Sequence, residues 1–257
     1  MSTIMQRADL GQARRLVVKL GTAVVTRDGF ELALGRLYGI VEELGRLHRE
    51  GASIMLVTSG AVGMGTRVLG LASRPTSLGL RQACAAVGMG HLMALYTQAF
   101  AQLGVIAAQV LLTQEDLADR DRALCLRTTL LRLLELRSLP VLNENDSVSV
   151  RELVEHRRVP GDEAQPAFGD NDGLSARVAV ALDADLLVLM TNVDGLFTAN
   201  PTVDPTATRI PERVGVPGQL DALASGRSAG GTGGMASKLE AARLSTEAGC
   251  PDRKSVV

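Results

Sequence analysis

The chain has 257 residues, of which 46% are hydrophobic and 21% are charged, and its formal net charge at pH 7 is −1. This balance is typical of a soluble globular protein and lacks the basic excess that binding to a nucleic-acid backbone requires. No run of about 18 apolar residues occurs, and residues 1–15 lack the apolar core of a signal peptide, so we expect a cytoplasmic protein without a membrane span. Three widely spaced cysteines without a CxxC pair indicate neither a disulfide framework nor a zinc site.

Short apolar runs rich in β-branched residues alternate with longer amphipathic stretches, which is the pattern of parallel strands joined by helices. We predict strands over residues 16–20, 53–58, 105–112, 139–142 and 185–190. We predict helices over residues 33–50, 78–103, 120–137, 171–182 and 234–248. The expected fold class is α/β, a three-layer αβα sandwich with a mainly parallel central sheet. Residues 1–14 are expected to be a flexible N-terminal segment, and residues 147–168 to form a protruding flap.

Polar and glycine-rich segments follow the carboxyl ends of four predicted strands. They span residues 19–22, 58–61, 143–146 and 191–195. In an open parallel sheet, ligands bind beyond these strand ends. We therefore expect the four segments to converge on one crevice.

The strongest local motif is the glycine cluster GGTGGMASK at residues 230–238, which leads into a predicted helix. Glycines let backbone N–H groups approach an anion, and a helix start adds positive potential, so the motif predicts a phosphate-binding loop with Lys238 one turn into the helix. It matches neither GxxxxGK[ST] nor GxGxxG, which argues against a P-loop and a dinucleotide fingerprint. Taken alone, the segment could equally be a surface loop before a helix.

Lysine is rare in this chain, because only three of its 27 basic residues are lysines, at positions 19, 238 and 254. Lys19 lies in an apolar strand, where a buried ammonium is costly unless an anion meets it; the alternative is an edge-strand lysine that points to water. Lys19 and Lys238 acting on one transferring phosphoryl group would form an electrostatic clamp. Such a pair of cations needs a carboxylate nearby.

Two polar motifs can complete a site of this kind. The GDNDG segment at residues 169–173 opens a predicted helix and can supply the carboxylate, although helix capping explains one of its two aspartates. The NEND segment at residues 143–146 follows a buried strand, and its amides and carboxylates suit the ammonium and carboxylate of a small substrate. Ser59 has no assignable base and is interpreted as a substrate hydrogen-bonding group. The three histidines, His48, His91 and His156, are interpreted as surface or packing residues.

Taken in order, these motifs resemble the amino-acid kinase family, and within it the kinases that phosphorylate glutamate. The resemblance covers nearly the full chain, and the NEND and GDND pair separates the glutamate kinases from acetylglutamate, aspartate and uridylate kinases. It implies ATP-dependent phosphorylation of the side-chain carboxylate of L-glutamate to L-glutamyl 5-phosphate, the first step of proline biosynthesis. A carboxylate is already ionised at pH 7, so this chemistry needs positioning and charge neutralisation but no general base.

The resemblance also implies roles for individual residues. Lys19 and Lys238 would bind the ATP phosphates and stabilise the transferring group, with Asp172 holding both lysines in place. Glutamate would contact Ser59, Gly60, Asn143, Asp146 and Asn171. The nucleotide would contact Lys19, Thr191, Asn192, Thr232, Gly233, Gly234, Met235, Ala236, Ser237 and Lys238. Mg²⁺ would bridge the phosphates, and no residue of the chain is assigned as a metal ligand. Many family members have Asp in place of Asn192, which leaves the nucleotide preference open.

The expected partners are L-glutamate and ATP, with proline as a feedback inhibitor and further copies of the chain in a dimer or tetramer. Two alternatives stay open: a kinase for another small carboxylate or amino acid, and a catalytically inactive nucleotide-binding fragment. At the C-terminus, residues 252–257 stand where the family continues with an apolar strand, and they match one reading frame of a short-read sequencing adapter. We therefore expect residues 15–251 to be an amino-acid kinase domain without its final strand, followed by a non-native tail over residues 252–257.

Overall fold

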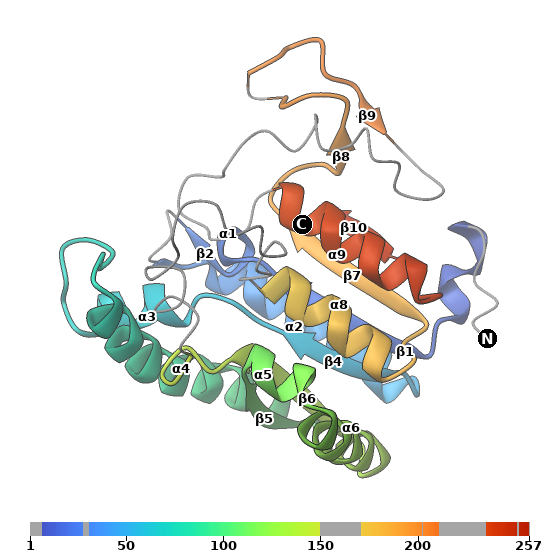
Figure 1. Ribbon diagram of the computed structural model, residues 1–257, viewed down its shortest axis with the longest axis horizontal. Coiled ribbons are helices and arrows are strands. Elements are labelled where there is room, and N and C mark those ends of the chain that lie inside the picture. Colours follow the sequence, from blue (N-terminus) through green and yellow to red (C-terminus); the bar gives the residue numbers. More distant parts are fainter. Residues whose placement is uncertain are drawn as a thin grey trace.

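A computed structural model describes residues 7–27, 31–149, 171–201, 203–210, 235–250 and 252–256. Its centre is a sheet of six parallel strands, shown in Figure 1. The strands are β1 (Arg15–Leu20), β4 (Ser53–Val57), β5 (Ile106–Leu112), β6 (Ser138–Glu144), β7 (Leu186–Thr191) and β10 (Asp252–Val256). Their order across the sheet is β10-β7-β1-β4-β6-β5, so β1 and β4 lie at the centre and β5 at one edge.

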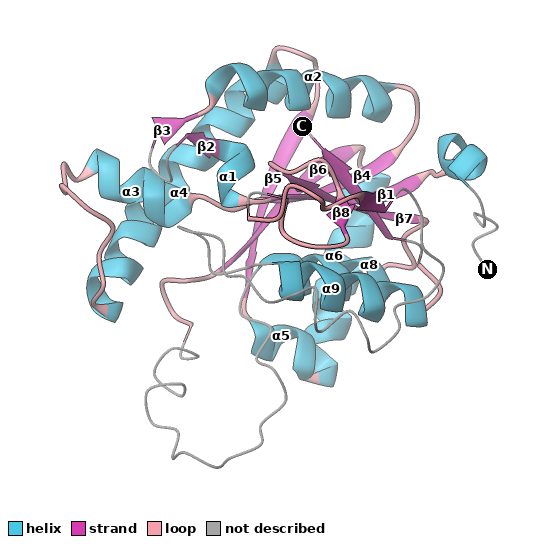
Figure 2. Ribbon diagram, turned by 90° about the horizontal axis from the view of Figure 1, so that it is seen from above, coloured by secondary structure: helices cyan, strands magenta, loops and turns pink. Residues whose placement is uncertain are grey.

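Helices cover both faces of the sheet (Figure 2). One side carries α1 (Thr22–Val25), α2 (Leu34–Arg49), α3 (Ala61–Val68) and α4 (Leu78–Ala101). The other side carries α5 (Gln114–Ala118), α6 (Arg120–Glu135), α8 (Asn171–Ala181) and α9 (Met235–Glu247). The remaining elements are the 3-10 helix η1 (Arg7–Gln12) and two small antiparallel pairs, β2 (Thr26–Arg27) with β3 (Glu31–Leu32) and β8 (Leu196–Phe197) with β9 (Arg209–Ile210). The predicted three-layer α/β class is confirmed.

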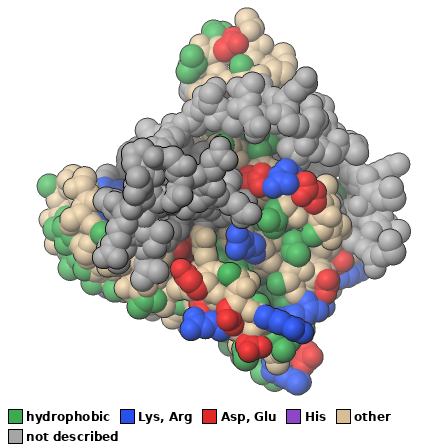
Figure 3. Space-filling model, viewed as in Figure 1, with side chains coloured by type: hydrophobic (Ala, Val, Ile, Leu, Met, Phe, Trp, Pro, Cys, Tyr) green, Lys and Arg blue, Asp and Glu red, His purple; other side chains and the backbone are tan. Residues whose placement is uncertain are grey.

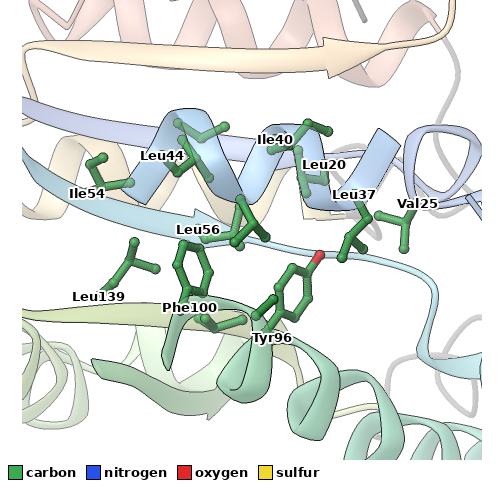
Figure 4. Close-up of a cluster of buried hydrophobic side chains, with 14 of the residues drawn as sticks. Leu20, Val25, Leu37, Ile40, Leu44, Ile54, Leu56, Tyr96, Phe100 and Leu139 are labelled. Atoms are coloured by element: carbon green, nitrogen blue, oxygen red, sulfur yellow. The ribbon is translucent and has the colours of Figure 1, made fainter. Parts of the chain in front are cut away.

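The central strand β1 shows how alternation places the site. Val18 and Leu20 belong to the hydrophobic core beneath α2 and α4, where Tyr96 and Phe100 also lie (Figure 4). Val17 belongs to the second core, beneath α6, α8 and α9. Successive side chains of a strand point to opposite faces, so Lys19 shares its face with Val17. The sequence pattern of β1 therefore directs the Lys19 ammonium toward α8 and α9.

All five predicted strands and all five predicted helices are present, with ends that differ by at most two residues. The helix α3 was missed, because Gly63 and Gly65 weaken a helical pattern. Tertiary packing explains one of these glycines. A Cβ on Gly65 would lie 1.8 Å from the Cys84 carbonyl oxygen of α4, so only glycine fits at this helix crossing. No helix in the described ranges is long and apolar enough to cross a membrane.

Parts of both chain ends have defined secondary structure. Within residues 1–14, η1 is helical and the backbone N–H of Arg14 donates to Asp185 Oδ2 at 2.9 Å, so the part next to β1 has defined structure. Residues 252–256 form β10, which pairs with β7 where the sequence analysis expected a missing strand. Backbone pairing requires an extended segment and not a particular side chain, so this strand can form without an apolar sequence. The non-native origin of the tail stays a prediction, and most of the flap at 147–168 lies outside the described residues.

Candidate active site

A buried cluster joins β1, α8 and α9 at the carboxyl end of the sheet. Lys19 is the penultimate residue of β1, and its Nζ lies 2.7 Å from Oδ1 of Asp172, the second residue of α8. Lys238, in the first turn of α9, places its Nζ 3.0 Å from Oδ2 of the same carboxylate. The Ser237 hydroxyl donates to Oδ2 at 2.9 Å. The structure thus brings Lys19 and Lys238, which are 219 positions apart along the chain, to the aspartate that the family resemblance assigned to hold them.

The charge balance of this cluster favours an anion. Burial by itself would raise the pKa of Asp172, but the Lys19 and Lys238 ammonium groups outweigh it and lower that pKa to about 2. Asp172 is therefore ionised at neutral pH, and two cations share one carboxylate, which leaves one net positive charge. The side chains of Lys19 and Lys238 are only 5% and 13% exposed, so bulk water does little to screen this charge. A phosphoryl group would supply the missing negative charge.

A second, uncharged cluster begins one residue before Asp172. The side-chain amide nitrogen of Asn171 lies 2.8 Å from the Thr58 carbonyl oxygen, 3.0 Å from Ser59 Oγ and 2.8 Å from Asn143 Oδ1. It therefore connects the ends of β4 and β6. Its carbonyl oxygen, Oδ1, is buried without a hydrogen-bond partner among the described residues. A buried acceptor of this kind suits a donor from a bound molecule, such as a substrate ammonium.

The strand-end glycines shape the space between these clusters. Gly60 has a φ of +105°, a left-handed conformation that L side chains rarely adopt, and it lets the chain turn from β4 into α3 directly after Ser59. A Cβ added to Gly21 would lie 3.6 Å from Lys19 Nζ and 3.6 Å from the Met190 carbonyl oxygen. The backbone after β1 therefore passes close to the Lys19 ammonium.

The NEND segment, residues 143–146, contacts Asn171 through its first residue. Asn143 is buried, and its amide is engaged at both ends: Oδ1 accepts from Asn171, and Nδ2 donates to Met89 Sδ at 3.4 Å. Asn143 therefore holds the side-chain amide of Asn171 in place. Asp146 follows in the loop after β6 and is partly buried.

Comparison with known proteins identifies the family. The sequence profile described as the Amino acid kinase family matches residues 14–252, which is most of the chain. The chain belongs to the amino acid kinase family.

Several relatives within this amino acid kinase family share one name. "Glutamate 5-kinase" from Moorella thermoacetica is 48% identical over 246 residues, which are 95% of this chain and 62% of that protein. "Glutamate 5-kinase" from Symbiobacterium thermophilum is 45% identical over 95% of this chain and 88% of that protein. The chain thus spans less than two thirds of the length of the first of these relatives.

Solved structures show the same amino acid kinase fold at much lower identity. Carbamate kinase from Giardia lamblia bound to AMP-PNP superposes with a TM-score of 0.61 at 15% identity, covering 96% of this chain and 94% of that one. UMP kinase from Bacillus anthracis gives a TM-score of 0.58 at 13% identity, covering 94% and 86%. At these identities the likeness shows the fold alone.

The structure describes only some of the residues that are expected to contact a nucleotide. Thr191 ends β7 and is buried, whereas Asn192 beyond it is exposed. Met235 and Ala236 open α9, and residues 232–234 lie outside the described residues. In the part of the chain that is described, no group of three or more His, Cys, Asp and Glu side chains lies close enough together to hold a metal ion.

The structure adds residues of α4 that sequence reasoning missed. The Thr58 carbonyl accepts from Asn171, and its hydroxyl lies 2.8 Å from Tyr96 Oη of α4. Met89, also on α4, accepts from Asn143. No local motif marks these side chains, because α4 looks like an ordinary apolar helix in the sequence.

On the outer face, the helices beside the site carry a mixture of charges of both signs (Figure 3).

The two described histidines lie on α2 and α4. His48 is buried on α2, where its Nε2 is 3.1 Å from the Arg137 carbonyl oxygen, and His91 is exposed on α4. His156 falls outside the described ranges. From the sequence, the histidines were interpreted as surface or packing residues. The two described histidines fit this interpretation.

Proposed function

We propose that this chain is an ATP-dependent glutamate 5-kinase, which transfers the γ-phosphoryl group of ATP to the side-chain carboxylate of L-glutamate. The product would be L-glutamyl 5-phosphate, and the reaction the first step of proline biosynthesis. The named relatives support this substrate, since they align over 95% of the chain at 48% and 45% identity.

The observation that carries the proposal is the adjacency of Asn171 and Asp172 at the start of α8. Asp172 holds both lysines, and Asn171 joins Ser59 and Asn143 at the neighbouring strand ends. We call the first group the donor cluster (Lys19, Asp172, Ser237 and Lys238) and the second the acceptor cluster (Thr58, Ser59, Asn143 and Asn171). A phosphate chain on the donor cluster and an amino acid on the acceptor cluster would meet beside one helix terminus, which is the positioning that in-line transfer requires.

The chemistry follows from the charges of the donor cluster. A carboxylate oxygen of glutamate attacks the γ-phosphorus, the bond from that phosphorus to the bridging oxygen breaks, and ADP leaves with the electron pair. Lys19 and Lys238 stabilise the charge on the oxygens of the moving group, while Asp172 keeps the two ammonium groups in place. Mg²⁺, carried on the nucleotide phosphates, would neutralise further charge there. The acceptor is already ionised, so no side chain has to remove a proton.

The test is ADP release measured with glutamate, aspartate and N-acetylglutamate as acceptors, with hydroxylamine present to trap an acyl phosphate. The proposal expects a hydroxamate with glutamate and a loss of turnover in Lys19→Ala. Turnover with another carboxylate alone would favour the alternative of a different small-molecule kinase. Calorimetric binding of ATP without turnover would favour an inactive nucleotide-binding fragment.

Further partners belong to the same proposal. A homo-oligomer is supported by β5, an edge strand of the sheet within the described ranges, whose Ile106 side chain is 66% exposed, because an exposed apolar edge strand favours association. Light scattering at several protein concentrations tests for a dimer or tetramer. Proline as an inhibitor rests on the family resemblance and is tested by adding proline to the ADP assay. A cytoplasmic location agrees with the need for ATP.

A further inference from the structure

One face of α4 lies against the acceptor cluster. Gln82, Met89 and Tyr96 are spaced seven residues apart, so they lie along the same side of the helix. Each forms a polar contact with a segment that leads to Asn171 or to the loop after β6. These contacts have no part in the chemistry described above.

Tyr96 supports the end of β4. Its side chain is fully buried and points from α4 toward β4 (Figure 4), and its hydroxyl lies 2.8 Å from Thr58 Oγ1. Thr58 is the residue whose carbonyl accepts from Asn171, and its own hydroxyl lies 3.3 Å from the Ser59 carbonyl oxygen. The Tyr96 hydroxyl therefore restrains the backbone that presents Ser59.

Gly88 sets the distance between α4 and α3. A Cβ at Gly88 would lie 1.8 Å from the Ala61 carbonyl oxygen and 2.4 Å from the Gly65 backbone nitrogen. Ala61 is the first residue of α3 and follows directly after Ser59 and Gly60. The close approach of the two helix backbones thus fixes where α3 starts, and with it the turn that carries Ser59.

Met89 supports the end of β6, and Gln82 supports the loop that follows it. Met89 Sδ accepts from Asn143 Nδ2 at 3.4 Å, and the Gln82 side-chain amide donates to the Ser149 carbonyl oxygen at 3.3 Å. The Ser149 hydroxyl in turn donates to Glu144 Oε1 at 3.2 Å. The same helix face therefore reaches both strand ends that Asn171 connects.

We propose that α4 is the positioning element of the acceptor site, and that Gly88, Met89 and Tyr96 determine how tightly the amino-acid substrate binds. This inference rests on the proposed function. The donor cluster is built on β1, α8 and α9, whereas α4 packs mainly against α3, β5 and α2. Perturbing the α4 face should therefore weaken glutamate binding and leave ATP binding nearly unchanged.

The experiment compares two glycines of α4 that are two residues apart. Gly88→Ala forces α3 away from α4 and is expected to raise the KM for glutamate roughly tenfold or more, because small misplacements of binding groups are costly. Gly90→Ala is the matched control, since nothing lies within 4 Å of a Cβ at Gly90. It should leave both KM values unchanged. The KM for ATP should stay within about twofold in both variants.

A third variant keeps the test valid if Gly88→Ala fails to fold. Tyr96→Phe retains the buried ring and removes only the hydroxyl, and it is expected to raise the KM for glutamate about threefold with kcat and the KM for ATP unchanged. A Tyr96→Phe enzyme with unaltered kinetics, or KM values for glutamate and ATP that rise equally, would overturn the positioning role while leaving the proposed function in place. A wild-type chain that turns over none of the tested carboxylates would overturn both proposals.

Discussion

The donor and acceptor clusters are neighbours on α8 but are held together by different forces. The donor cluster is a charged assembly in which a fully buried carboxylate meets two ammonium groups at 2.7 and 3.0 Å. The acceptor cluster is neutral and consists of amides, hydroxyls and backbone carbonyls arranged around Asn171. Removing one member of a buried charged cluster leaves an uncompensated charge, whereas removing a neutral group leaves an unpaired donor or acceptor. The donor cluster should therefore be the more sensitive of the two.

The largest effect is expected from Asp172→Asn, which leaves Lys19 and Lys238 facing each other without a carboxylate. We expect a loss of roughly 3–5 kcal/mol in the free energy of unfolding, as for other buried pairs that lose a partner, together with a loss of turnover. Urea denaturation and ADP release measure the two effects. Asp183→Asn is the control, because Asp183 is paired with Arg127 but is 74% exposed, so its removal should cost about 1 kcal/mol or less. Equal losses in the two variants would contradict the comparison.

Lys238→Ala should mainly lower the rate of phosphoryl transfer. It removes one of two cations from the transferring group, and kcat should fall roughly 100-fold or more, the range seen when one transition-state donor is lost. Arg243→Ala on the same helix is the control, since the Arg243 side chain is 42% exposed and pairs with Glu240 and Glu247 of α9 itself. Its kcat should stay within about twofold of wild type. If kcat fell by a comparable factor in both variants, the cause would be a less stable α9 and not the loss of a lysine from the clamp.

The free energy of unfolding should depend on acid pH through the donor cluster but not through the acceptor cluster. The pKa of Asp172 is lowered to about 2 from 3.8, so its contribution is fully present above pH 3.8 and is lost as the pH falls toward 2. A shift of this size corresponds to about 2 kcal/mol. Between pH 5 and pH 3, urea unfolding should show roughly half of this loss, about 1 kcal/mol, in wild type and a smaller loss in Asp172→Asn. The neutral acceptor cluster has no such dependence, so Ser59→Ala should retain the full wild-type slope.

The smallest effect is expected at His48, a buried neutral group away from both clusters. Burial, and then the nearby Arg137 guanidinium, lower the pKa of His48 below 6.5. Its contribution to stability is therefore present above pH 6.5 and decreases as the pH falls below that value, because the unfolded chain binds the proton more readily. His48→Gln should flatten the stability profile between pH 7 and pH 5 in thermal melts. A steeper profile in the variant would show that His48 is protonated in the folded chain.

The elements of this fold were predictable because their causes are local. Strands such as β1 are short, mainly apolar runs that contain β-branched residues, and helices such as α2 repeat their apolar residues at helical spacing. The charged cluster was also recognisable, since a lysine inside an apolar strand needs a buried partner. The short helix α3 could not be predicted, because Gly65 weakens its helical pattern and is required by the approach of another helix, not by the local sequence.

The amino-acid sequence by itself determined the α/β class, and it predicted the strand-end positions of the polar residues and a pair of lysines that needs a nearby carboxylate. These properties follow from hydrophobic periodicity and from the cost of burying a charge, both of which act at single positions. Only the tertiary structure decided that α4 lies behind Asn171 and that Tyr96 and Gly88 adjoin the acceptor cluster. Neutral hydrogen bonds and close backbone contacts join distant segments without demanding a conspicuous residue type, so packing alone reveals them.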